Sequence, residues 1–261
     1  MRVRFHSLAA LVAALTVVPS AARAQGILNT ERFQLDDVSG FHTSVDFSLS
    51  GAAGNADYLD ASASGILGFR SERHWLRLIG GGKFLADDER RVLDDRFAQL
   101  RYSYAVSSAL ETFYFLQVQA NRSLLLENRW LAGGGIRFPV ARSERTQLHL
   151  GTGIMYEEER RDREQIGPAD EPQLSTVRVA NHVVVRHELP GGAKLLDILY
   201  FQPSATSISN VRLLNDLGLE VPLSDHVSLS AAVEWRHDSR PPASLETDDV
   251  RFRTGITIDL N

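Results

Sequence analysis

The chain has 261 residues and a formal net charge of -5, with 43% hydrophobic and 23% charged residues. This mild acidity is spread along the chain without any basic stripe, which argues against nucleic acid as a partner. Cysteine is absent, which excludes disulfides, thiolate metal sites and a thiol nucleophile.

Residues 1–24 have the three-part layout of a cleavable secretory signal peptide. Arg2 and Arg4 form a short positive region, residues 8–18 are apolar, and residues 22–24 supply the small side chains that a signal peptidase needs. The apolar run is too short to cross a bilayer as a helix. We therefore expect export from the cytoplasm and cleavage after Ala24.

Strand patterning begins at Phe41. Residues 25–40 are polar and weakly patterned, so we expect them to form a short periplasmic lead-in. Phe41, Val45 and Phe47 then alternate with polar neighbours in a strict period of two. This period predicts a strand with one apolar and one polar face.

The same alternation recurs to the end of the chain. It is found within residues 59–70, 76–79, 98–104, 110–121, 129–138, 147–157, 177–186, 196–200, 212–220, 227–236 and 250–260. These segments give about twelve strands, an even number within the range of outer-membrane barrels. No segment approaches the roughly 18 uninterrupted apolar residues of a membrane helix.

The expected connections separate into two classes of length. Those at 71–72, 106–109, 141–145, 190–193 and 222–225 are short, whereas those at 86–95, 158–172 and 238–249 are longer and more polar. Tight periplasmic turns and long exterior loops are typical of outer-membrane barrels. The aromatic residues fall mostly near strand ends, as interfacial girdles would require.

The predicted fold is therefore all-β: a transmembrane, up-and-down antiparallel β-barrel of about 12 strands over residues 41–261. We expect a monomer in the outer membrane, surrounded by lipid and lipopolysaccharide and inserted by the barrel-insertion machinery. A soluble periplasmic or lipocalin-like protein is the alternative, because period alone does not tell which face is inward.

Strand parity predicts which polar side chains face the lumen. The candidates are Arg101, Glu111, Arg137, His149, Glu157, Arg178 and His182. Arg101, Glu111 and Arg137 fall on three consecutive strands, so we expect them to pair and help to close the lumen. An acid–base or metal set of His149, Glu157 and His182 is conceivable, but polar wall residues bonded to water and to each other are the favoured interpretation.

Enzyme signatures are missing from the sequence. It has no His-Glu-x-x-His and no Gly-x-Ser-x-Gly, and residues 80–83 (Gly-Gly-Gly-Lys) lack the spacing of a phosphate loop. We expect no catalytic residue, cofactor or metal. Three functions stay open: a structural or envelope-stress barrel with a narrow polar lumen, a porin-like channel for small solutes, and an enzyme that modifies lipid or lipopolysaccharide.

Two central segments resemble a known family. Residues 128–137 (NRWLAGGGIR) followed by residues 148–159 (LHLGTGIMYEEE) are similar to the central signature of an outer-membrane family of unassigned domain function. Its members are often labelled salt-induced outer membrane proteins. The resemblance extends over about residues 41–260 and implies an outer-membrane barrel, but the family carries no established activity to transfer.

Overall fold

The structure is a computed structural model that describes residues 27, 29, 31, 39–52, 58–87, 90–224 and 227–258. The expected signal peptide at residues 1–24 lies outside the described residues, as does most of the expected lead-in. Within the described ranges, no helix has the length and apolar character needed to cross a membrane.

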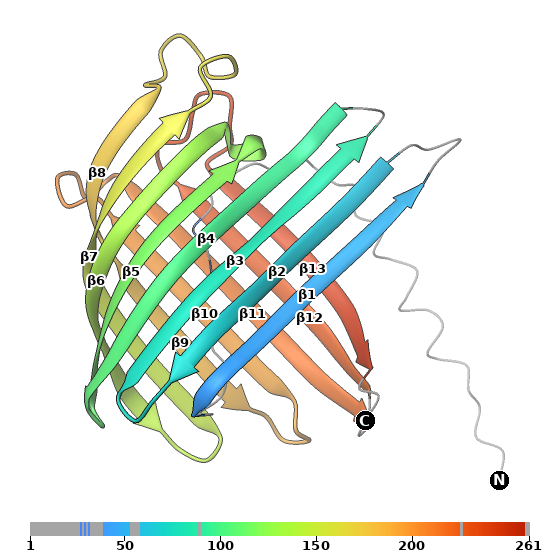
Figure 1. Cartoon of the computed structure of the whole chain (residues 1–261), viewed down its shortest axis with the longest axis vertical. Coiled ribbons are helices and arrows are strands. Elements are labelled where there is room, and N and C mark those ends of the chain that lie inside the picture. The colour runs from blue at the N-terminus through green and yellow to red at the C-terminus, as the bar shows by residue number, and fades with distance from the viewer. Residues whose placement is uncertain are drawn as a thin grey trace.

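The described chain forms one antiparallel sheet of 13 strands, in which strands next to each other in sequence pair, except that β8 and β9 both pair with β7 (Figure 1). This confirms the prediction of an all-β, up-and-down antiparallel fold. The strands are β1 (Gly40–Ala52), β2 (Tyr58–Arg70), β3 (His74–Asp87), β4 (Arg90–Ser107), β5 (Leu110–Asn121), β6 (Leu126–Arg142), β7 (Thr146–Arg161), β8 (Gln173–Val179), β9 (Asn181–Glu188), β10 (Lys194–Pro203), β11 (Val211–Ser224), β12 (Val227–Asp238) and β13 (Asp248–Ile258). A 3-10 turn, η2 (Arg122–Leu124), links β5 to β6.

The thirteenth strand arises from an interruption at Ala180. On one side of it Val179 of β8 lies opposite Ile154 of β7, and on the other side His182 of β9 lies opposite Gly151. These two pairs share one register, so β8 and β9 continue the same row of the sheet. Counted across the sheet, the strands therefore form twelve hydrogen-bonded rows, in agreement with the about twelve strands predicted from the sequence.

The sheet curves round on itself but keeps two edges. β1 and β13 stand at the two ends of the strand order, and no ladder joins them within the described residues. The structure thus shows the curved antiparallel sheet without the closure that the sequence led us to expect.

The connections at the two ends of the sheet differ in length, as predicted. Strands β2 and β3, β4 and β5, and β6 and β7 are joined by short turns, whereas long connections span 162–172 and 239–247 at the opposite end. The prediction of a long polar loop at 86–95 is wrong, because β3 and β4 continue to pair as far as Asp87 opposite Arg90. The polar composition of this stretch resembles that of a loop, but backbone pairing does not depend on apolar alternation.

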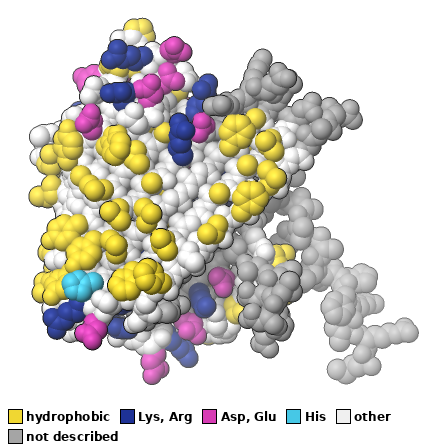
Figure 2. Space-filling model, in the orientation of Figure 1, with side chains coloured by type: hydrophobic (Ala, Val, Ile, Leu, Met, Phe, Trp, Pro, Cys, Tyr) yellow, Lys and Arg dark blue, Asp and Glu magenta, His cyan; other side chains and the backbone are white. Residues whose placement is uncertain are grey.

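The two faces of the sheet have inverted polarity compared with a water-soluble protein. The convex face exposes large apolar side chains, such as Phe47 at 70%, Leu116 at 59% and Phe252 at 67% exposure. Figure 2 shows hydrophobic side chains in a broad band on one face of the molecule, between charged groups at the two ends. The concave face buries charges instead, with Arg77 and Glu159 fully inaccessible.

Glycines in the central signature make room on the inner face. A Cβ atom on Gly151 would lie 2.0 Å from the ring of His182, which packs directly over the bare backbone. A Cβ atom on Gly153 would lie 2.3 Å from the carbonyl oxygen of Gly134 on the neighbouring strand. Any larger residue at these positions would push β6, β7 or the inner side chains apart.

Candidate functional site

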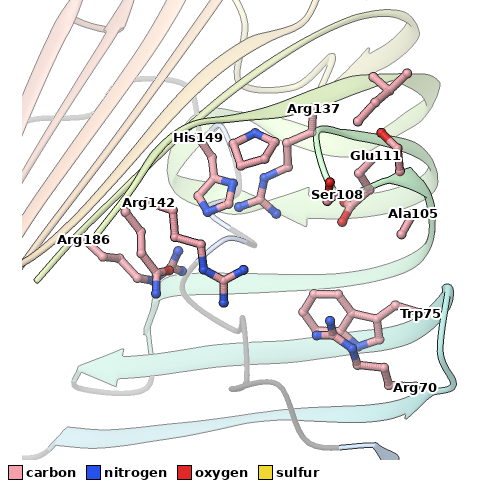
Figure 3. A pocket seen from close by; sticks show the side chains of 13 residues that line it. Arg70, Trp75, Ala105, Ser108, Glu111, Arg137, Arg142, His149 and Arg186 are labelled. Carbon is pink, nitrogen blue, oxygen red and sulfur yellow. The ribbon is translucent and has the colours of Figure 1, made fainter. Parts of the chain in front are cut away.

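The interior of the curved sheet contains the seven side chains that parity predicts for the lumen. Arg101, Arg137, Glu157, Arg178 and His182 are at most 5% exposed. Glu111 and His149 are half-buried and line a cavity together with Arg137 (Figure 3). The structure distributes these seven residues over several clusters rather than one site.

Near the long-loop end, carboxylates of β7 and β12 and four arginines form the upper network: Arg129, Glu157, Glu159, Arg161, Arg178, Arg212 and Asp238. Their side chains are at most 7% exposed. Glu159 accepts from Arg129 at 3.0 Å and from Arg161 at 3.0 Å, while Glu157 accepts from Arg178 at 3.1 Å. Each buried charge therefore faces an opposite one, the condition under which ion pairs persist away from water.

Arg212 connects the upper network across the interior. From β11 it contacts Glu159 of β7 at 2.8 Å, Asp238 of β12 at 2.9 Å, and Glu157 of β7. Asp238 is the register partner of Arg212 on the adjacent strand. β9 and β10 separate β7 from β11 in the sheet, so the contacts with Glu157 and Glu159 cross the interior instead of following a ladder. Sequence parity places Arg212 on a strand but gives no sign of this distant pairing.

Three residues from the expected periplasmic lead-in lie against the inner wall. Ile27, Asn29 and Glu31, which we call the plug residues, are at most 7% exposed. Ile27 packs into an inward apolar cluster of Val184, Ile198, Tyr200 and Leu214 from β9, β10 and β11. The sequence of this segment shows no regular alternation of polar and apolar residues, because the three plug residues contact side chains of different chemistry on the inner wall.

Polar contacts hold the other two plug residues. Asn29 donates from its Nδ2 to Asp216 at 2.9 Å. The carboxylate of Glu31 lies 2.8 Å from a guanidinium nitrogen of Arg101 and 3.4 Å from one of Arg137. The three plug residues therefore meet an apolar cluster, a carboxylate and two guanidinium groups in turn.

Glu31 takes the place that we expected for Glu111. Glu111 does lie opposite Arg137 in the register of β5 and β6, but the carboxylate that joins Arg101 to Arg137 belongs to Glu31. Within the described structure, Oε1 of Glu111 is buried without a hydrogen-bond partner. The excess of inward arginines on these strands is the sequence signal that a further carboxylate was needed.

Aromatic rings fill the middle of the interior. The ring of His182 lies 5.6 Å from that of Phe113 and 5.9 Å from that of Tyr200. The space left beside them is about 50 Å³ and also touches Ile27. A water molecule needs roughly 10–15 Å³ of such space, so there is room for a few waters and not for a hydrated organic solute.

His149, Glu157 and His182 do not assemble into one acid–base or metal site. Glu157 is engaged by two arginines, His182 packs between aromatic rings, and His149 lines the cavity at the short-turn end. Over the described ranges, no group of three or more His, Asp or Glu side chains has the geometry to hold a metal ion. What the arrangement can do is close the interior by packing and ion pairing.

These features define a class: an antiparallel all-β sheet that is apolar outside and ion-paired inside. The chain belongs to the family described as "Protein of unknown function, DUF481", which matches residues 45–260. This membership confirms the resemblance of its central strands to a family of unassigned domain function. No curated protein matches the chain.

One similar solved structure is titled "Bacterial polysaccharide outer membrane secretin". It shares 10% sequence identity with this chain, covers 84% of this chain and 90% of its own, and superposes with a TM-score of 0.46. A likeness at that level carries no argument about this chain.

Proposed function

We propose that this chain crosses the outer membrane as a β-barrel closed by its own interior, and that it serves the envelope as a structural or stress-related protein. The observation that carries the proposal is the inverted polarity of the sheet. Leu116 and Phe252 are more than half exposed on the outside, whereas Arg77 and Glu159 are buried inside.

An apolar exterior of this extent suits lipid better than water. Soluble monomers rarely expose contiguous apolar patches beyond a few hundred Å². The outer band of Figure 2 is broad and is bordered by charged side chains, which suit the two aqueous interfaces. A soluble sandwich or lipocalin-like barrel would turn its apolar face inward.

The strands are also long enough for this role. A membrane-spanning strand needs roughly 9–11 residues when tilted, and β5 and β12 have 12 each. Backbone groups at a sheet edge have no water to bond with inside a bilayer, so we propose that β1 and β13 pair with each other there. The short turns would then face the periplasm and the long loops the exterior, next to lipopolysaccharide.

Export follows from the expected signal peptide at residues 1–24, and the barrel-insertion machinery would act during biogenesis. We propose a monomer, because a sheet that closes on itself needs no second copy to satisfy its edges.

The interior supports a structural role rather than a wide pore. The upper network crosses the lumen near one end, and the plug residues occupy its middle. A conducting pore needs a continuous hydrated path, and the central space of about 50 Å³ is too small to provide one.

The three tryptophans of the chain provide a direct test of the membrane proposal. Trp130 and Trp235 are 58% and 39% exposed on the outer face, whereas Trp75 is 6% exposed. In vesicles with brominated acyl chains, variants that keep only Trp130 or only Trp235 should be strongly quenched. The variant that keeps only Trp75 is the matched control and should be quenched least; the reverse order would contradict the proposal.

A small-solute channel is the second candidate, favoured by a cavity of about 300 Å³ at the short-turn end. It would require the plug residues to leave the interior. We propose no enzymatic role. His187, an outward histidine near the short turns, shares a hydrogen bond of 2.8 Å with Thr146 on the adjacent strand. His237, an outward histidine near the long-loop end, shares a hydrogen bond of 3.0 Å with Asp248, and within the described residues no serine hydroxyl is hydrogen-bonded to either ring to serve as a nucleophile.

A further inference from the structure

The plug residues are held in the interior by side chains and not by strand pairing. Among the described ladders of the sheet, none includes Ile27, Asn29 or Glu31. Their contacts are the apolar cluster around Ile27, the carboxylate of Asp216 beside Asn29, and the arginines beside Glu31. A guanidinium nitrogen of Arg186 adds a hydrogen bond of 3.4 Å to the backbone carbonyl oxygen of Glu31. Residues seated in this way are bound like a ligand and form no part of the wall.

The three contacts are made with separate parts of the curved sheet. Ile27 packs on β9, β10 and β11, and Asn29 donates to a carboxylate of β11. The carboxylate of Glu31 reaches Arg101 of β4 and Arg137 of β6 instead. In the strand order, β7, β9 and β10 separate β6 from β11. The site that holds the plug residues therefore depends on the curvature that brings these parts of the sheet together.

Each of the three positions accepts a different chemistry. The cluster around Ile27 includes Val184 and Leu214, which are fully inaccessible, so a charge placed there would lose its hydration. Asp216 accepts from an amide, and Arg101 binds a carboxylate at 2.8 Å. An apolar side chain, an amide and a carboxylate at alternate positions satisfy all three contacts, whereas the same side chains in another order do not.

We propose, on the basis of the function proposed above, that the interior is a binding site for a peptide and that the plug residues are its built-in competing ligand. The peptide comes from the periplasmic side and carries apolar, amide and carboxylate side chains at alternate positions. Residues 32–39 connect Glu31 to β1, and a short tether gives an attached segment an effective concentration on the order of millimolar. Free peptide is therefore excluded until the plug residues withdraw.

Binding of a dye-labelled peptide with the sequence of residues 25–33 tests the site. The receptor is the full mature chain in detergent micelles with Ile27→Asp and Glu31→Arg, which places charges that neither contact accepts and so expels the plug residues. Fluorescence anisotropy should show saturable binding to this variant, and binding to the parent should be at least about tenfold weaker because its own plug competes. Ile208→Asp with Glu246→Arg makes the same changes at exposed loop positions and should bind as weakly as the parent.

A second peptide of identical composition separates the order of the side chains from their net charge. In this exchanged peptide the isoleucine and the glutamate trade places, so the carboxylate would meet the apolar cluster and the isoleucine would meet the arginines. It should bind the Ile27→Asp/Glu31→Arg variant at least about tenfold more weakly than the first peptide does. Equal affinity for the two peptides, or no saturable binding of either by the folded variant, would overturn the proposal.

A displacement measurement keeps the test decisive if that variant fails to fold. The chain has no cysteine, so Ile27→Cys introduces a single thiol into the apolar cluster, where burial keeps it unreactive. The first peptide at millimolar concentration should displace the plug residues and raise the rate of maleimide labelling at least about tenfold, whereas the exchanged peptide should not. A labelling rate that the first peptide leaves unchanged would also overturn the proposal.

Failure of the peptide site and failure of the membrane barrel give different results. Both peptide measurements are made in micelles, whereas the barrel is tested by the quenching of Trp130 and Trp235 in brominated lipid. Strong quenching without peptide binding would reject the peptide site alone.

Discussion

The same substitution at two depths separates a membrane barrel from a soluble protein. Leu116 lies in the middle of β5 and is 59% exposed on the outer face, and Leu223 lies beside the short-turn end of β11 and is 62% exposed. In a bilayer, arginine costs roughly 2–4 kcal/mol at the midplane and about 0–1 kcal/mol near the interface. In water, both positions are exposed surface, where a substitution changes stability by less than about 0.5 kcal/mol.

Leu116→Arg should therefore cost about 2–3 kcal/mol more than Leu223→Arg. The measurement is the free energy of unfolding from a denaturant titration with reversible folding into lipid vesicles, on both variants and the parent. Both leucines are similarly exposed, so their difference isolates depth in the membrane from exposure itself. Equal costs at the two positions, or a larger cost at Leu223, would refute the reasoning.

Three further predictions concern the interior, and each is checked by the free energy of unfolding in micelles. Glu31→Gln leaves two buried arginines without their carboxylate and should cost roughly 3–5 kcal/mol; a cost near zero would mean that Glu31 does not hold the plug. Arg212→Met leaves the upper carboxylates without their central partner and should cost a similar amount, whereas Arg163→Met, at an exposed loop position, should cost almost nothing. Gly151→Val should cost roughly 1–3 kcal/mol by overpacking, and His182→Ala in the same chain should recover part of that loss because the ring no longer obstructs the new side chain.

The strands could be predicted because alternation is a local property of the sequence. Phe41, Val45 and Phe47 follow period two, and all three are at least 70% exposed on the outer face of β1. Residues 86–95 were harder, since their sequence is polar and lacks the alternation although β3 and β4 pair as far as Asp87 opposite Arg90. The arrangement of the sheet edges depends on β1 and β13, which lie far apart in sequence, so no local pattern could have revealed it.

The interior contacts were much less predictable than the faces. Parity indicates which side of a strand a residue occupies, but it does not name the partner that the residue meets across the lumen. Arg101 is an example: its partner Glu31 comes from a segment without strand patterning. Arg212 is another, since its partner Glu159 is three rows away in the sheet.

Conductance across planar bilayers tests the central claim, a membrane barrel closed by its own N-terminal segment, most directly. The parent protein should insert without stable conductance steps. Ile27→Asp with Glu31→Arg places a charge in the apolar cluster and a cation among arginines, so it should expel the plug residues and open stable steps. Ile208→Asp with Glu246→Arg makes the same changes at exposed loop positions and should stay closed like the parent. A large, steady conductance in the parent, unchanged by Ile27→Asp with Glu31→Arg, would contradict the account.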